Sequence, residues 1–200
     1  MSSASSRPWG CLLPLAAVVL MFAGLGLYMK LLSMYEESHP AAAAPPDLCA
    51  AIGTGIFEHL VPDGVPDPKG TYSSGSDAAC QYRTAEHRPI DSDTYGFLGV
   101  RLLRHGQVGW DSGADRAADA LASSCANTAL AGQLHTTSSL GDAACTAYND
   151  EGKDGTATGS VVVRRGADLL WVDYYTHPGT AREAQQAVTE TTLAALARVP

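Results

Sequence analysis

The chain has 200 residues, 46% of them hydrophobic, with 13 basic and 21 acidic side chains and a formal net charge of −8 at pH 7. A surface this acidic repels phosphate groups, which argues against nucleic acid and anionic lipid headgroups as partners. Beyond its amino-terminal segment, the chain is long enough for one ordinary hydrophobic core.

The amino-terminal segment contains nineteen uncharged residues, from Cys11 to Met29. At about 1.5 Å per residue, a helix of this length measures roughly 28 Å and matches the hydrocarbon core of a bilayer. The alternative is a cleaved signal peptide, whose apolar region is normally about 7–15 residues long and ends in a small-residue cleavage site. We therefore favour an uncleaved transmembrane anchor over residues 11–29.

The flanking charges predict the orientation of this anchor. Arg7 and the α-amine precede it without an acidic residue, whereas two glutamates closely follow Lys30. Positive charge tends to stay in the cytoplasm, so residues 1–10 are expected there. Residues 30–46, rich in alanine and proline, predict a short extended spacer. An extracytoplasmic domain is expected over residues 47–200.

Two segments of this domain combine a cysteine with an apolar helical stripe. Asp47 can cap the first helix. Its stripe consists of Cys49, Ile52, Ile56 and Leu60. The second stripe consists of Ala114, Ala118, Leu121, Cys125 and Ala129.

The tetrapeptide Asp-Ala-Ala-Cys occurs twice, each time after one of these helices and ahead of a strand-like run. Four cysteines allow three pairings, and spacing alone leaves all three open. The repeated placement favours the disulfides Cys49–Cys80 and Cys125–Cys145. Buried free thiols are the alternative. The anchor, the even number of cysteines and the absence of a CxxC pair favour disulfides, which form in oxidising compartments.

Strands are predicted at residues 95–106, 156–166 and 167–177, where β-branched and aromatic residues are frequent. In the last strand, alternation places Leu170, Val172 and Tyr174 on one face. The opposite face then carries Leu169, Trp171, Asp173 and Tyr175.

The final helix is predicted over residues 181–198, because Thr180 and Glu183 have the spacing of a capping box. Its inward stripe consists of Ala184, Val188, Thr191, Ala195 and Val199. The expected fold class is α+β, with one transmembrane helix followed by a disulfide-bonded domain. The domain has the element order α-β-β-α-β-β-β-α and a mainly antiparallel sheet covered by helices.

Several stretches give the domain a resemblance to known extracytoplasmic proteins: LCAAI, LGDAAC, VVVRRGADLLWVDYY and the alanine-rich final helix. Over residues 47–199 the chain resembles actinobacterial DUF3558-type secreted lipoproteins and the extracellular sensor domain of PknH-type receptor kinases. The resemblance implies a disulfide-bonded α+β domain outside the membrane, with a place for a ligand-binding cleft. It supplies no catalytic residues, and this chain has neither a lipobox nor a kinase domain.

The sequence contains no specific catalytic or metal-binding motif. Its histidines lack partners at metal-ligand spacing, and there is no G-x-S-x-G elbow. Residues 149–155, NDEGKDG, fit a hairpin turn better than a calcium loop. Arg164 and Arg165 lie at another predicted turn, where we expect them to be solvated. We therefore predict no enzyme activity, no cofactor and no metal.

Trp171, Asp173 and Tyr175 are the candidate binding residues, because an acid between two aromatic side chains on one strand face suits a ligand or partner surface. The alternative is that they are half-buried sheet residues beneath a helix. The predicted function is a membrane-anchored, non-catalytic binding or sensing module in an actinobacterial envelope. Its partners would be the membrane and a small ligand or an envelope protein. An envelope hydrolase with a dispersed active site is the alternative.

The predicted topology can be tested with protease added to intact protoplasts. If residues 47–200 lie outside the membrane, as the apolar run and the cysteines indicate, protease should remove the folded domain. Protection of the domain until the membrane is broken would contradict this orientation.

Overall fold

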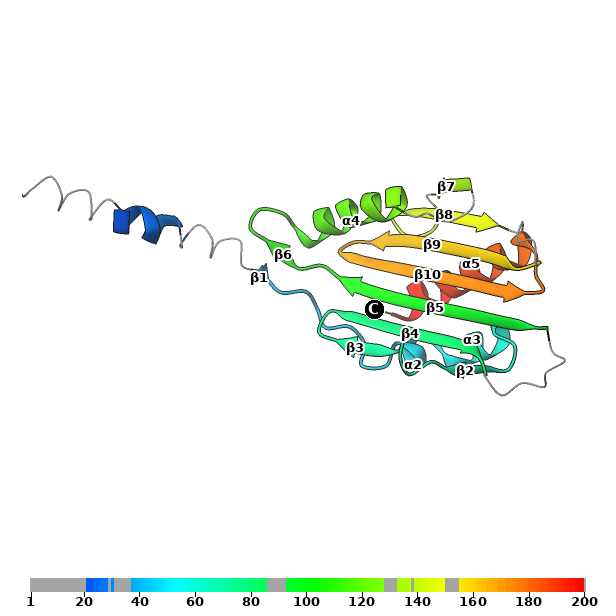
Figure 1. Ribbon diagram of the computed structural model, residues 1–200. Coiled ribbons are helices and arrows are strands. Elements are labelled where there is room, and N and C mark those ends of the chain that lie inside the picture. The colour runs from blue at the N-terminus through cyan, green and yellow to red at the C-terminus, as the bar shows by residue number, and fades with distance from the viewer. Residues whose placement is uncertain are drawn as a thin grey trace, which may run out of the picture.

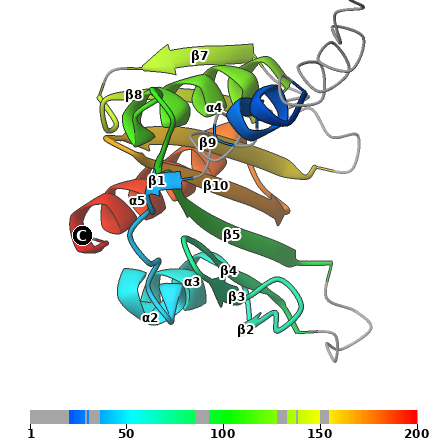
Figure 2. The ribbon, with the colours of Figure 1, turned by 90° about the vertical axis from the view of Figure 1, so that its left-hand side faces the viewer.

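A computed structural model describes residues 21–28, 30, 37–85, 93–127, 133–137, 139–149 and 155–199. It contains one eight-stranded sheet with helices on both faces (Figures 1 and 2). Every strand pairing described in this sheet is antiparallel. The predicted α+β class and antiparallel sheet are therefore confirmed.

The elements follow one another along the chain as listed here. They are β1 (Glu37–His39), α2 (Leu48–Ile52), α3 (Thr54–Leu60), β2 (Gly64–Pro66), β3 (Tyr72–Ser74), β4 (Asp77–Thr84), β5 (Tyr95–Arg104), β6 (Gln107–Val108), α4 (Gly113–Asn127), β7 (Gln133–Thr137), β8 (Ala143–Asn149), β9 (Ala157–Arg165), β10 (Asp168–His177) and α5 (Ala181–Arg198). The strand order is β2-β4-β5-β10-β9-β8-β7, and β3 also pairs with β4.

The predicted element order, α-β-β-α-β-β-β-α, is wrong in detail. The first helix is divided in two, because Gly53 has a φ of +106° that an α-helix cannot contain. Strands β1, β2, β3 and β6 have two or three residues each and lack the alternation that would predict a strand. Strand β7 adds a further edge beside β8.

The central strands β5 and β10 join the two halves of the sheet. Their ladder contains ten residue pairs, from Asp168 opposite Arg104 to His177 opposite Tyr95. On one side β5 continues to β4, and on the other β10 continues to β9 and β8 (Figure 1). The strands of the two halves therefore belong to one continuous sheet.

The rear face of the sheet is the face that packs on α2, α3 and α5 (Figure 2). Its buried strand residues include Cys80, Tyr82, Leu98, Val100, Leu102, Leu170, Val172 and Tyr174. The predicted alternation of the last strand is thus confirmed, and the face with Leu170, Val172 and Tyr174 is the one that enters the rear core. The bounds, capping box and buried stripe of α5 are also confirmed.

The front face of the sheet is the face on which α4 packs. There Leu121 of α4 contacts a second, smaller core made with Cys145, Val162 and Leu169. Helix α4 packs on β9 and β10. No described helix lies over the front of β4 and β5 (Figures 1 and 2).

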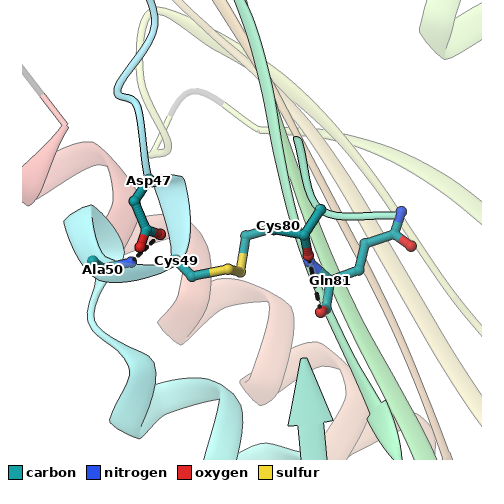
Figure 3. Close-up of a disulfide and its surroundings, with 6 residues drawn as sticks. Asp47, Cys49, Ala50, Cys80 and Gln81 are labelled. Atoms are coloured by element: carbon teal, nitrogen blue, oxygen red, sulfur yellow. Dashed lines mark hydrogen bonds between the residues drawn. A yellow bond between two sulfur atoms is a disulfide. The ribbon is translucent and has the colours of Figure 1, made fainter. Parts of the chain in front are cut away.

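The two predicted disulfides are confirmed. Cys49 and Cys80 are joined with sulfur atoms 2.08 Å apart, which fastens α2 to β4 at the rear of the sheet (Figure 3). Cys125 and Cys145 are joined with sulfur atoms 2.04 Å apart, which fastens α4 to β8 at the front. The predicted cap of α2 is also present, since Asp47 accepts a hydrogen bond from the Ala50 amide (Figure 3).

Each Asp-Ala-Ala-Cys copy lies at the start of a strand. Its cysteine forms a disulfide, and its aspartate contacts an arginine of the neighbouring strand. Asp77 forms an ion pair with Arg101 of β5, at 2.7 Å between Oδ2 and Nη2. Asp142 lies 3.5 Å from Nη1 of Arg164 in β9. The repeat therefore fastens its strand to a helix through the cysteine and to the neighbouring strand through the aspartate.

Arg165, which we expected to be solvated, is only partly exposed and is bound to α5. Its Nη1 and Nη2 donate to the carbonyl oxygens of Leu196 and Val199, at 2.6 and 2.5 Å. These carbonyls belong to the last turn of α5, where the helix itself supplies no donors. Periodicity could not reveal this contact, because it joins residues more than thirty positions apart.

Among the described residues, none of the helices combines the length and the apolar character needed to cross a bilayer. Residues 21–28 of the predicted anchor are helical, and residues 1–20 lie outside the described part. The segment expected to be a spacer is hydrogen-bonded to the domain. The Ala43 oxygen accepts from Arg104, and the Ala44 amide donates to the Gly75 oxygen.

Removal of either disulfide should destabilise the domain. Chain-entropy arguments give about 3–4 kcal/mol for loops closed by separations of 31 and 20 residues. The double variants C49A/C80A and C125A/C145A should each lose stability of this order in urea unfolding. A double variant that unfolds with the free energy of the parent would contradict the expectation for that bridge.

Candidate binding face

The part of the front face that α4 leaves uncovered is the candidate site. Strand register places the side-chain positions of five residues of β4, β5 and β10 together there: Gln81, Phe97, Gly99, Asp173 and Tyr175. We call this surface the open face. Because its positions come from three hydrogen-bonded strands, its spacing is fixed by the sheet.

Trp171 lies at the border between the open face and α4. It is half-buried and packs against the small core that contains Leu121. The guanidinium of Arg101 lies over its ring, 5.2 Å from the ring centroid. Of the three candidate residues, Trp171 is thus the one that also supports the packing of α4.

Arg101 is held in this position by Asp77. Its Nε and Nη2 donate to the two carboxylate oxygens, at 3.1 and 2.7 Å, and the Tyr72 hydroxyl donates to Oδ1 at 3.2 Å. The hydrogen bonds from Arg101 hold the pKa of the Asp77 carboxyl below its usual value, although burial opposes this effect. The same bonds raise the pKa of Arg101. The result is a fixed cation at one end of the open face.

Asp173 lies in the middle of the open face, opposite Gly99 on one side and Ser160 on the other. The Ser160 hydroxyl donates to its carboxylate. Desolvation raises the pKa of Asp173, and the hydrogen bond from Ser160 opposes that rise. Since Asp173 nevertheless remains exposed to solvent, screening by water limits the shift. Its carboxylate can accept hydrogen bonds from a ligand.

Four rings continue the site toward the far end of β10. Phe97 stacks on Tyr175, with ring centroids 5.2 Å apart and an interplanar angle of 11°. Tyr95 stacks on His177 at 5.0 Å and 15°. Tyr95 and Tyr175 meet edge to face at 6.3 Å. We call these four side chains the ring row.

The glycine beneath the ring row determines how Phe97 lies. A Cβ atom at Gly99 would come within 2.8 Å of the Phe97 ring, so only glycine leaves room for the ring in this position. Phe97 can thus lie along the strand. A pair of parallel, stacked rings on the open face that also carries Asp173 is the consequence.

The ring row contains three residues that the sequence analysis did not select: Tyr95, Phe97 and His177. Tyr175 was selected from the alternation within a single strand. Tyr95 and Phe97 follow the same alternation on β5, and this signal was available in the sequence. The pairing of β5 with β10 was needed to bring the four rings together.

Two hollows lie away from the open face. One of about 390 Å³ lies beside α2, and its lining includes Asp47, Tyr72 and Tyr82. Another of about 280 Å³ lies between α3 and α5, and its lining includes His59 and Glu183. Asp47 and Glu183 already cap helices, so each carboxylate has a structural role.

The described ranges contain no group of three or more metal-ligating side chains that could hold an ion. His59 is exposed, and no hydrogen bond joins it to a serine or carboxylate in the described part. Nδ1 of His177 is buried and has no hydrogen-bond partner among the described residues. Chemically, the open face offers aromatic surface, one carboxylate and one guanidinium.

Comparisons with protein-family models, curated proteins and solved structures give no match for this chain. The resemblance to actinobacterial lipoprotein and sensor domains therefore stays a prediction. The assignment of Trp171, Asp173 and Tyr175 as binding residues also stays a prediction.

The Asp77–Arg101 pair should make stability depend on pH. The pKa of Asp77 is lower in the folded chain than in the unfolded one, so its contribution is present above the unfolded pKa, about 3.9. This contribution to stability is lost as pH falls through the pKa that Asp77 has in the folded chain. D77N should therefore cost about 1 kcal/mol or less near neutral pH, because the pair is partly exposed. This cost should disappear in strong acid.

Urea unfolding at neutral and acidic pH measures this difference. The matched control is D119N, which removes the same charge from an exposed position on α4. An equal effect of D77N and D119N at both pH values would contradict a specific contribution from the Arg101 pair.

Proposed function

We propose that this chain is a membrane-anchored, extracytoplasmic binding module that holds its ligand on the open face. The observation that carries the proposal is the ring row beside Asp173, on a rigid sheet surface that α4 leaves uncovered. The module performs no chemistry on its ligand.

The compartment is supported by the disulfides and by the sequence before the domain. Two bridges connect helices to strands on opposite faces, and such bridges persist in oxidising spaces. The nineteen-residue uncharged run supports an anchor of bilayer length. The resemblance to actinobacterial lipoproteins and sensor domains agrees with a location in the cell envelope.

The ligand class follows from the chemistry of the open face. Exposed aromatic rings such as Tyr95 and Tyr175 accept the apolar face of a polar molecule, and a carboxylate beside them accepts hydrogen bonds from hydroxyl or amide groups. A sugar chain combines both properties, since each ring has C–H faces and a rim of hydroxyls. We propose a glycan of the cell envelope as the ligand.

The chain's acidic character agrees with a ligand that is neutral or weakly charged. A net charge of −8 disfavours polyphosphate chains and other strongly anionic polymers. Arg101 is already paired with Asp77 and therefore offers little free charge to an anion. Stacking on the ring row would supply most of the affinity.

Co-sedimentation with insoluble, protein-free cell-wall glycan tests this function. The unsubstituted chain should sediment with the glycan, and Y175A should lose most of this binding because it removes the exposed ring of the stacked pair. The ring contact itself contributes only about 0.5–1.5 kcal/mol to folding, so Y175A should stay folded. Absence of sedimentation by the unsubstituted chain would contradict the ligand class.

Trp171 provides the matched comparison. Because it packs beneath α4, W171A should lower the melting temperature more than Y175A does. D173N keeps the size of the side chain and should weaken glycan binding with little change in stability. Full binding by both Y175A and D173N would contradict the open face as the site.

A further inference from the structure

The domain has a defined end at the point where the chain arrives from the predicted anchor. Strand β1 pairs with β6, with Glu37 opposite Val108 and His39 opposite Gln107. The contacts of Ala43 and Ala44 with Arg104 and Gly75 continue this attachment along the domain. Figure 1 shows β1 and β6 beside each other.

The distance from this end to the bilayer is limited by chain length. Six residues lie between Lys30, which follows the apolar run, and Glu37 of β1. At about 3.3–3.6 Å per residue, the seven steps from Lys30 to Glu37 span at most roughly 25 Å. If the anchor crosses the membrane as proposed, β6 is thus held near the bilayer surface.

A tight turn at this end presents Trp110. The amides of Val108 and Asp111 each donate to the other's carbonyl oxygen at 3.1 Å, and Gly109 has a φ of +59°. Trp110 lies within this turn and is 94% exposed. Single exposed apolar residues are common on protein surfaces, so the exposure alone indicates nothing. Its position, on a turn continuous with the strand that pairs with β1, is the informative observation.

We propose that Trp110 inserts into the headgroup region of the membrane that anchors the chain. The inference rests on the anchor of the proposed function and is independent of the glycan site. Tryptophan suits this region because its indole combines a large apolar surface with an N–H donor. Two contacts, the anchor and Trp110, then fix the orientation of the domain.

The charge around the turn defines the lipid chemistry. Asp111 and Asp115 are exposed beside Trp110, and they repel anionic headgroups. The contact therefore depends on the uncharged part of the interface. It should form with zwitterionic lipid, persist at high salt and weaken when anionic lipid is added.

Fluorescence quenching in nanodiscs tests the insertion with the full chain. The variant W9F retains Trp110 and Trp171, and W9F/W110F retains Trp171 alone. The difference in emission between W9F and W9F/W110F measures the emission of Trp110. In discs of brominated phosphatidylcholine, this excess emission should be quenched. In unbrominated discs this excess should remain and be shifted to shorter wavelength than for a tryptophan in water.

A tryptophan at the opposite end of β5 provides the matched control. In W9F/W110F/Y95W, the new indole replaces an exposed tyrosine and should escape quenching, because the length of β5 separates it from β6. Quenching of Y95W equal to that of Trp110 would contradict the proposed orientation.

The remaining outcomes separate the inference from the function on which it rests. Failure of the chain to co-elute with nanodiscs would contradict the anchor and this inference with it. Co-elution without quenching of Trp110 would contradict this inference alone. Neither result depends on whether the open face binds glycan.

Discussion

The pairing of β5 with β10 is the interaction on which the rest of the structure depends. Each half of the domain has its own strand pair and its own disulfide, and among the described strands this ten-residue ladder joins the halves into one sheet. The ladder also forms part of the rear core, where β10 packs on α5 and β5 packs on α3. On the front it brings Phe97 beside Tyr175 and Tyr95 beside His177. The candidate site therefore exists only because this ladder has this register.

The two Asp-Ala-Ala-Cys copies show how one local motif serves two faces. Cys80 points to the rear core with Val100, whereas Cys145 points to the front core with Val162. Successive side chains of a strand point to opposite faces of the sheet. A cysteine moved by one position along its strand would therefore attach its helix to the other face. The front of the sheet is consequently divided between α4 and the open face.

Local features of the sequence predicted local features of the structure. The capping box of Thr180 and Glu183 predicted the start of α5, and the repeated cysteines predicted both disulfides. Each prediction used residues close together or a pattern that occurs twice. The break in the helix at Gly53 was harder to predict, because glycine occurs within helices as well as at their ends. The short strands β1, β2, β3 and β6 show no apolar–polar alternation in the sequence, and each forms by pairing with another strand.

The candidate site was predicted only in part for the same reason. Trp171, Asp173 and Tyr175 share one strand face, which alternation reveals. The three side chains have different neighbours, and these neighbours come from distant parts of the sequence. Trp171, for example, packs beneath α4. The partners of Tyr175 are about eighty positions earlier, on a strand that could have paired elsewhere. The capping of α5 by Arg165 is likewise a contact that no local pattern encodes.

The direction of the strands has a mechanical consequence. The pairing of β1 with β6 lies just beyond the carboxyl end of β5, and the ring row lies at the opposite end of the same strand, beside the carboxyl end of β10. If the chain is anchored and binds its ligand as we propose, a force between the anchor and the ligand would act along β5 and β10. The hydrogen bonds of an antiparallel ladder lie perpendicular to the strands, so such a force loads them together in shear. The bonds would then have to break as a group, and the domain would resist extension in the direction in which its ligand pulls.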